Sequence, residues 1–208
     1  MNKAINRKGL MLILSSPSGG GKSTLANLII ETVKDTVLSV SATTRPKRNG
    51  EVDGKHYFFK AHETFADMVK DGEFLEYAKV FDNMYGTPKG FVYDEINAGK
   101  DVVFDIDWQG ARQLRENAGD DVVSIFILPP SLKELERRLN NRLQDDETVI
   151  ANRMNGALSE ITHWNEYDYV LVNEDLEETL AKIKTILYAE RLKRTRQDAN
   201  LKKITSSF

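Results

Sequence analysis

The sequence predicts an α/β fold in which helices cover a mostly parallel sheet. Short apolar runs alternate along the chain with segments of helical periodicity, the order of elements that builds such a sheet. Four runs are almost uniformly apolar, as parallel strands buried on both faces are. They are residues 10–14, 102–106, 122–128 and 169–172. A fifth candidate strand, at residues 37–41, is less uniform.

Helices are predicted between these strands. Ser131 and Glu134 have the spacing of a capping box, and the preceding Pro129 and Pro130 end a strand. The segments expected to be helical are residues 23–33, 93–98, 108–117, 131–140, 148–165 and 176–193.

Composition limits the class of protein. The chain has 208 residues, 40% of them hydrophobic and 29% charged, which suits one domain or one domain with inserted lobes. A net charge of -3 removes any general electrostatic argument for a nucleic-acid partner. The absence of cysteine excludes disulfides and thiolate metal sites. The first apolar run is too short for a signal peptide or a membrane span, so we expect a cytoplasmic protein without a membrane partner.

A glycine-rich segment, SSPSGGGKST, joins the first strand to the first helix. Glycines let consecutive backbone N–H groups turn toward an anion, and a helix N-terminus adds partial positive charge. The pattern G-x-x-x-x-G-K-[ST] directs Lys22 to the β and γ phosphates and the Ser23 hydroxyl to Mg²⁺. The alternative is a flexible turn. The residues expected to hold a nucleoside triphosphate are Ser16, Pro17, Ser18, Gly19, Gly20, Gly21, Lys22, Ser23 and Thr24.

One position of this loop departs from the pattern. Ser16 stands where the first glycine belongs, so a positive φ there would strain the loop.

Two carboxylates end a predicted strand. Asp105 and Asp107 lie two residues apart, so both point to one face at the carboxyl end of the strand. Asp105 could hold Mg²⁺ through water, as a Walker B carboxylate does. Asp107 could instead cap the helix that begins at Trp108.

Several strings together resemble the guanylate kinase family in order and spacing. They are SVSATTRPKRNGEVDGKHYFF (39–59), FLEYAKV (74–80), YGTP (85–88), DIDWQGARQ (105–113) and VNEDL (172–176). The resemblance extends from residue 9 to residue 192. It implies the reversible reaction of ATP and GMP to ADP and GDP, with Mg²⁺, on a P-loop NTPase core carrying a GMP-binding lobe and a mobile lid.

The resemblance divides one domain, residues 9–193, into three parts. The expected core is 9–40, 97–137 and 157–193, the inserted mixed α/β lobe is 41–96, and the helical lid is 138–156. The tails are 1–8 and 194–208, and the basic C-terminal tail is expected to be a frayed, solvated helix end rather than a binding arm.

The lobe carries the candidate ligands of GMP. The monophosphate is a dianion that favours planar arginines, and Arg45 and Arg48 are the candidates. The resemblance adds Tyr57 and Tyr85 as hydroxyl donors to the same phosphate. Each residue alone could equally belong to a solvated loop or an amphipathic rim.

Guanine presents N1–H and N2 amine donors together with the O6 acceptor, so its pocket needs a carboxylate and hydroxyls. By the resemblance, Glu76 is the carboxylate, Ser41 and Thr87 are the hydroxyl partners, and Asp107 lies near the base or its waters. The alternative for Glu76 is an exposed strand residue. Adenine would leave a buried carboxylate unpaired.

Arginines of the lid match the family and would neutralise charge on the transferring phosphoryl group. They are Arg138, Arg142 and Arg153, which join Lys22 and Arg45 as the catalytic candidates. Arg138 and Arg142 could instead pair with Glu134 on a solvated helix. Leu143 follows Arg142, where the family usually has glycine.

Two further points complete the expectations. Asn173 matches a position near the adenine of ATP, or it begins a turn before the last helix. No general base is needed because the second phosphate pKa is about 6, so the three histidines are expected to be structural.

Two other function classes are weighed against the kinase. A non-catalytic interaction module lacks a working P-loop, against which Lys22 and Ser23 argue. A GTPase or another P-loop ATPase would not need Glu76, Arg45 or Tyr85. The expected partners are ATP and GMP, and the sequence leaves open whether the protein is a homo-oligomer.

Overall fold

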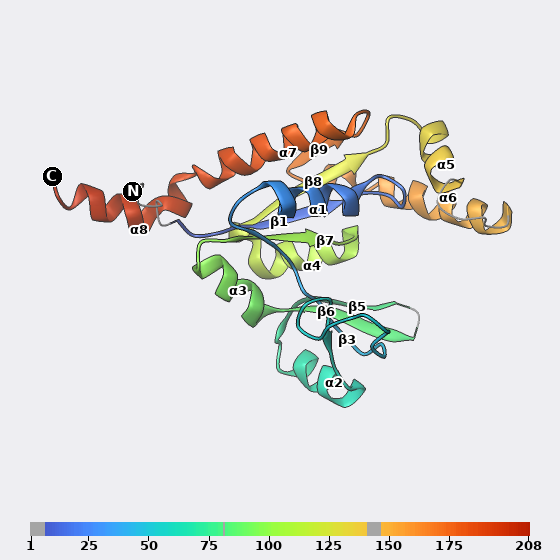
Figure 1. The fold of residues 1–208 in the computed structure, drawn as a ribbon, viewed down its shortest axis with the longest axis horizontal. Coiled ribbons are helices and arrows are strands. Elements are labelled where there is room, and N and C mark those ends of the chain that lie inside the picture. The colour runs from blue at the N-terminus through green and yellow to red at the C-terminus, as the bar shows by residue number, and fades with distance from the viewer. Residues whose placement is uncertain (1–6, 81, 141–146) are drawn as a thin grey trace.

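The computed structural model describes residues 7–80, 82–140 and 147–208. A five-stranded sheet carries helices on both faces, and a smaller four-stranded sheet lies beyond one of the covered faces (Figure 1). All neighbours in the larger sheet are parallel, in the order β2-β7-β1-β8-β9, which confirms the predicted fold class. Its strands are β1 (Met11–Ser15), β2 (Thr36–Leu38), β7 (Asp101–Asp105), β8 (Val122–Leu128) and β9 (Tyr169–Val172).

Four helices cover the two faces of this sheet. α1 and α7 lie on one face, and α3 and α4 lie on the other (Figure 1). Their bounds are α1 (Lys22–Thr32), α3 (Lys89–Asn97), α4 (Trp108–Ala118) and α7 (Leu176–Arg191). The strand predicted at 37–41 is the short edge strand β2, and the helix predicted at 93–98 begins four residues earlier, directly after Pro88.

The central strand β1 is buried on both faces because successive side chains alternate. Leu12 and Leu14 pack in the core formed with α1 and α7. Met11 and Ile13 pack in the second core, formed with α3 and α4. This arrangement explains why the sequence of β1 is continuously apolar and not alternating.

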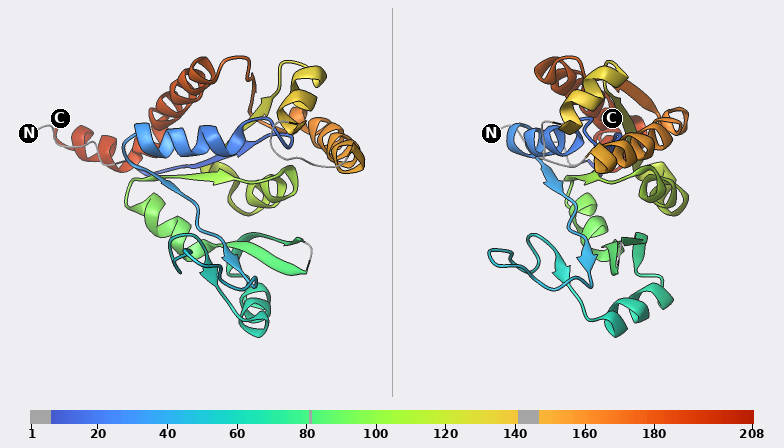
Figure 2. Two further views of the ribbon diagram at one scale, coloured as in Figure 1. Left: turned by 45° about the vertical axis from the view of Figure 1, so that its right-hand side comes forward. Right: turned by 90° about the vertical axis from the view of Figure 1, so that its right-hand side faces the viewer.

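The smaller sheet has the order β4-β3-β6-β5 and lies on the side of α3 and α4 in both views of Figure 2. Its strands are β3 (Ala42–Thr43), β4 (Phe58–Phe59), β5 (Phe74–Val80) and β6 (Asn83–Pro88). Helix α2 (His62–Lys70), which the sequence analysis did not predict, packs on it through Phe65. The ring of Phe65 stacks on that of Phe74 at 4.5 Å. Phe65, Met68 and Val69 have the spacing of one helix face, but the segment has only nine residues and is otherwise polar, so the sequence analysis missed it.

Helices α5 (Leu132–Asn140) and α6 (Glu147–Ile161) form a separate pair with its own small core, which contains Leu135, Leu139 and Ala157. Half of the predicted capping box is present, since the Glu134 N–H donates to Ser131 Oγ at 3.1 Å. The Glu134 carboxylate accepts hydrogen bonds from Arg137 and Arg138 and not, among the described contacts, from the Ser131 N–H. The helix predicted at 148–165 ends at Ile161. Two short 3₁₀ segments complete the secondary structure, η1 (Gly119–Asp121) and η2 (Trp164–Glu166).

The C-terminal tail forms the helix α8 (Arg194–Thr205) and is not simply a frayed end. Arg196 is only 6% exposed, and its carbonyl accepts a hydrogen bond of 2.9 Å from the Lys8 N–H. The prediction of a solvated tail is therefore wrong for the first turns of this helix. Within the three described ranges, no helix has the length and apolar character that crossing a membrane requires.

Candidate active site

The loop between β1 and α1 surrounds a pocket of about 290 Å³. Gly21 caps α1 with φ 97°, a conformation that suits glycine and turns the backbone into the helix. The pocket is lined by Ser16, Pro17, Ser18, Gly19, Gly21, Lys22, Ser23 and Glu160. A pocket made of backbone N–H groups, a lysine and a helix N-terminus is suited to phosphate.

Ser16 fits this loop without strain. Among the non-glycine residues of the described ranges, Asp35 alone has a positive φ, so the strain foreseen at Ser16 is absent. The Ser16 hydroxyl donates to the Pro17 carbonyl at 3.0 Å. A Cβ on Gly20 would lie 2.7 Å from that of Ser16, so the serine requires glycine at this neighbouring position.

Lys22 forms an ion pair with Asp105, with 3.0 Å between Nζ and Oδ1. The pair joins the start of α1 to the end of β7 and is partly exposed, at 21% and 26% for the two side chains. The Ser23 hydroxyl and the Asp105 carboxylate are oxygen donors of the kind that Mg²⁺ prefers. No group of three or more histidine or acidic residues within the described ranges could hold a metal by itself. A cation here would therefore need phosphate oxygens and water as its other ligands.

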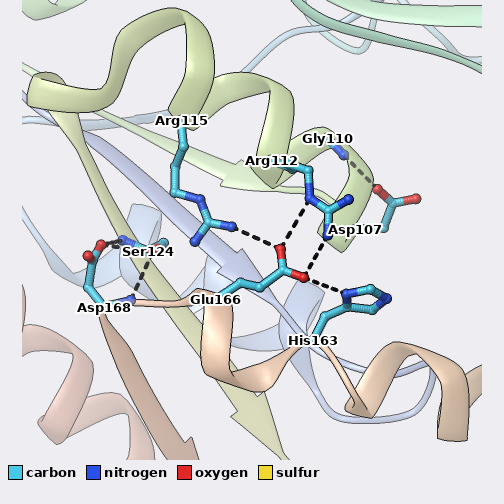
Figure 3. Close-up of polar contacts among 8 residues, drawn as sticks. All are labelled: Asp107, Gly110, Arg112, Arg115, Ser124, His163, Glu166 and Asp168. Carbon is cyan, nitrogen blue, oxygen red and sulfur yellow. Dashed lines mark hydrogen bonds and ion pairs between the residues drawn. The ribbon is translucent and has the colours of Figure 1, made fainter.

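Asp107 is the N-cap of α4. One of its carboxylate oxygens accepts a hydrogen bond of 2.9 Å from the Gly110 N–H, as Figure 3 shows. Asp107 therefore caps the helix that begins at Trp108, which was the alternative role considered for it. Capping uses Oδ1 and leaves Oδ2 available to a ligand or to water.

A cluster around Glu166 holds the segment after α6 against α4 (Figure 3). The Glu166 carboxylate accepts hydrogen bonds from Arg112 at 2.7 Å and from Arg115 at 3.4 Å, and it lies 2.6 Å from His163 Nδ1. The His163 ring stacks on that of Trp108, with 3.7 Å between the centroids. These contacts agree with the structural role expected of this histidine.

A second polar site lies in the smaller sheet. Glu76 on β5 is directly paired with Thr87 on β6, and the Thr87 hydroxyl donates to Glu76 Oε1 at 2.6 Å. Glu76 is 7% exposed, and burial is the main reason that the pKa of its carboxyl lies above the usual value. A Cβ on Gly110 would lie 3.5 Å from Glu76 Oε2. This second oxygen therefore reaches the first turn of α4, which Asp107 caps.

The same lobe gathers a cation and two phenol rings. Arg45 lies over the Tyr57 ring, 5.4 Å from its centroid, and the Tyr57 and Tyr85 rings meet edge to face at 6.0 Å. Arg48 is exposed, and its backbone N–H is fixed by Glu51. Ser41 is half-buried, and its carbonyl accepts a hydrogen bond from the Phe58 N–H.

Asn173 connects β9 to the P-loop. The side-chain amide of Asn173 donates to the Gly20 carbonyl at 3.0 Å. The backbone carbonyl of Asn173 accepts a hydrogen bond of 3.1 Å from Arg138 Nη2. Arg138 also forms an ion pair with Glu134 at 2.8 Å, and this pair was the alternative considered to its role in the lid. A pocket of about 390 Å³ beside the P-loop is lined by Gly19, Gly21, Thr24, Arg138, Asn173, Glu174, Asp175 and Leu176.

Two of the three candidate lid arginines have no described side chain. Arg142 lies outside the described residues. Arg153 belongs to α6, and its side chain lies outside the part of the chain that the structure describes. Of this set, only Arg138 is placed beside the P-loop.

Sequence reasoning missed Glu160. The Ser18 N–H donates to its Oε2 at 2.9 Å, and burial raises the pKa of its carboxyl. The contact brings the last turn of α6 onto a loop 142 residues away. No local pattern could have indicated it, because it depends on how α6 packs.

The two sites, a P-loop and a buried carboxylate paired with a threonine, can be compared with known proteins. A family model described as guanylate kinase matches residues 8–190. The chain belongs to the guanylate kinase family. A guanylate kinase of Nitrobacter winogradskyi is 58% identical over 193 residues, which cover 93% of this chain and 88% of that protein. A guanylate kinase of Bradyrhizobium diazoefficiens is 56% identical, and the match covers the same fractions of the two chains, 93% and 88%.

A solved structure agrees. The crystal structure of guanylate kinase from Anaplasma phagocytophilum has a TM-score of 0.71 and 43% identity, and the match covers 91% of this chain and 89% of that one. The family makes this chain a nucleotide-binding transferase with guanylate kinase activity, and it confirms the resemblance seen in the sequence.

Proposed function

We propose that this guanylate kinase transfers the γ-phosphoryl group of ATP reversibly to GMP, and also to dGMP, with ATP at the P-loop and GMP at the smaller sheet. The observation that carries this assignment is the buried pair of Glu76 and Thr87. A monophosphate-binding lobe with a buried carboxylate has no purpose in a plain ATPase. A P-loop with Lys22 and Ser23 has none in a non-catalytic module.

Guanine binds at Glu76 in this proposal. Its N1–H and N2 amine donate to the carboxylate, which Thr87 already orients from one side. Ser41 and Asp107 complete the edge of the base, directly or through water. Adenine has an acceptor where guanine has N1–H, so it would leave the buried carboxylate unpaired.

The phosphate of GMP binds at Arg45 and Arg48, with the hydroxyls of Tyr57 and Tyr85 as further donors. Charge-assisted bonds to arginine suit a dianion, and the contact of Arg45 with Tyr57 brings two of these groups together.

ATP binds with its phosphates against residues 16–24 and its adenine in the neighbouring pocket beside Asn173 and Arg138. Lys22 leaves Asp105 and turns to the phosphates. Ser23 and Asp105 are the residues that would hold Mg²⁺, which neutralises phosphate charge when it is bound.

The chemistry is positioning and charge neutralisation. An oxygen of the GMP phosphate, already ionised, forms a bond to the γ-phosphorus as the bond to the β–γ bridging oxygen breaks and ADP leaves. Lys22 and Arg45 bring the two nucleotides into line. We assign the remaining stabilisation to Arg138, Arg142 and Arg153 of the lid, residues 138–156.

The same proposal includes the boundaries stated from the sequence, namely a core of 9–40, 97–137 and 157–193 and a lobe of 41–96. It places the enzyme in the cytoplasm and admits a homo-oligomer. Limited proteolysis with and without nucleotides tests the boundaries, and light scattering tests the assembly.

The test is ADP release from purified protein with ATP and Mg²⁺, comparing GMP, dGMP, AMP, CMP and UMP with no acceptor. Rapid turnover with GMP and dGMP alone is expected. Turnover without an acceptor would indicate an ATPase, and no turnover with any acceptor would indicate an interaction module.

A further inference from the structure

Glu51 binds two parts of the loop that carries both phosphate-binding arginines. Its Oε1 accepts a hydrogen bond of 2.6 Å from Arg45 Nη2, and its Oε2 accepts one of 2.7 Å from the Arg48 backbone N–H. The Glu51 N–H in turn donates to the Arg48 carbonyl at 3.2 Å. Both oxygens of one carboxylate therefore fix the loop at two positions.

The Arg45 side chain is held in one orientation. It is 12% exposed and Glu51 is 19% exposed, so the pair is largely shielded from water. The guanidinium lies 5.4 Å from the centroid of the Tyr57 ring and 5.9 Å from that of Phe59, and its Nη1 donates to the Pro46 carbonyl at 2.8 Å. The two bonds use two of the five N–H donors that a guanidinium carries.

We infer that Glu51 is a positioning residue for the acceptor substrate, which holds Arg45 and the Arg48 backbone in the arrangement that receives the phosphate of GMP. The inference rests on the proposed role of Arg45 and Arg48. Glu51 itself acts through the arginines and does not contact the reacting atoms.

The physical advantage is preorganisation. A free arginine side chain loses considerable rotamer freedom when it binds a phosphate, and that cost falls when another contact has already fixed the side chain. The hydrogen bond to Arg45 is the main reason that the pKa of Glu51 lies below its usual value, and the bond to Glu51 is the main reason that the pKa of Arg45 lies above its own. The pair is therefore ionised at neutral pH.

A matched control exists in the same loop. Asp53 is also a carboxylate that binds the backbone, since its Oδ1 accepts a hydrogen bond of 2.8 Å from the Phe59 N–H. Asp53 has no contact with Arg45 among those that the structure describes. Comparing Glu51→Ala and Glu51→Gln with Asp53→Asn separates the orientation of Arg45 from general support of the loop.

The experiment measures the KM for GMP, the KM for ATP and kcat for each variant, together with the inhibition constant of guanosine. Glu51→Ala should raise the KM for GMP about tenfold, as expected when a charge-assisted contact loses its preorganised donor. Guanosine lacks the phosphate, so its inhibition constant and the KM for ATP should stay within about twofold of wild type. Glu51→Gln keeps one acceptor oxygen, so its KM for GMP should lie between those of wild type and Glu51→Ala.

A double-mutant cycle tests whether Glu51 acts through Arg45. In the background of Arg45→Ala, the change Glu51→Ala should raise the KM for GMP by clearly less than about tenfold, because only its contact with the Arg48 backbone remains to be lost. If the increases in the KM for GMP from the two substitutions are additive, the inference is overturned. An equal weakening of GMP and guanosine binding would also overturn it. So would an increase in the KM for GMP in Asp53→Asn as large as that in Glu51→Ala. If Glu51→Ala does not fold, Glu51→Gln alone decides, and an unchanged KM for GMP overturns the inference. Failure of wild type to phosphorylate GMP would instead overturn the proposed function.

Discussion

Thr87 donates a hydrogen bond of 2.6 Å to Glu76 across strands β5 and β6, and Thr87 is completely buried. One oxygen of the Glu76 carboxylate accepts this bond, and the other lies near the first turn of α4. The second oxygen can accept hydrogen bonds from a ligand. This pair is the basis for the base specificity proposed above.

Replacing the carboxylate by an amide should weaken that specificity. Glu76→Gln should lower the ratio of kcat/KM for GMP to that for AMP by about 100-fold, because the amide offers one acceptor where guanine needs two. The matched control is Glu73→Gln, which removes the same charge from an exposed residue nearby. An unchanged ratio in Glu76→Gln would contradict the assignment.

The same substitution should increase stability at neutral pH. Burial raises the pKa of Glu76 in the folded protein, so as pH rises above the ordinary value of 4.5 the unfolded state loses this proton first and stability falls. Glu76→Gln escapes that cost and can still accept the Thr87 hydrogen bond. Urea unfolding at several pH values should show a stability advantage for the variant that grows from pH 4.5 upward. A variant less stable than wild type at pH 7 would refute the prediction.

Lys22→Ala should lower kcat by about 100- to 1,000-fold with the fold intact, because its charge on the transferring phosphate is lost. Lys34→Ala, at an exposed lysine after α1, is the control. Steady-state kinetics and circular dichroism measure the effect, and wild-type kcat would exclude the role.

Asn173 offers an isosteric test of the P-loop. Asn173→Ala loses the hydrogen bond to the Gly20 carbonyl, a loss of about 1 kcal/mol that should raise the KM for ATP roughly fivefold. Asn173→Asp has the same shape but places an acceptor against that carbonyl, so its loss should be larger. Isothermal titration with an ATP analogue measures both, and equal affinities in Asn173→Asp and wild type would refute the contact.

Asp101 should matter for stability and not for catalysis. This carboxylate is fully buried and binds Arg7 at 2.6 Å, Arg191 at 2.7 Å and the Leu10 N–H at 3.1 Å. Asp101→Ala would remove the carboxylate shared by two largely buried arginines and should cost about 3 kcal/mol in the free energy of unfolding. Urea titration tests this. A cost below about 1 kcal/mol would show that the cluster contributes little.

The sequence predicted the fold wherever burial dictates the residue pattern. Strands β8 and β9 were predicted with the bounds that the structure gives. β8 is buried along most of its length, and such a strand must be uniformly apolar. β9 is an edge strand with Val170 and Val172 exposed, so burial on both faces does not explain its apolar run. Helix α2 was missed although Phe65, Met68 and Val69 lie on one helix face, because the segment is short and otherwise polar. Local pattern also could not distinguish a frayed tail from α8, whose Arg196 is buried by contacts with distant residues.

For the site, the motif and the family resemblance named residues that the structure brings together, such as Arg45, Tyr57 and Tyr85. Long-range contacts of acidic side chains were not predictable. Glu160 reaches the P-loop from α6, and the role of Glu51 depends on a loop conformation that no periodicity describes.

The alternation of β1 has a consequence for insertions and deletions. Its even-numbered leucines face α1 and α7, while Met11 and Ile13 face α3 and α4. Deleting one residue from β1 would exchange the two sets of side chains and would also turn the start of the P-loop to the opposite face of the sheet. Point substitutions between similar apolar residues leave this geometry intact. Length variation in this family should therefore accumulate in surface loops, while the length of β1 stays fixed.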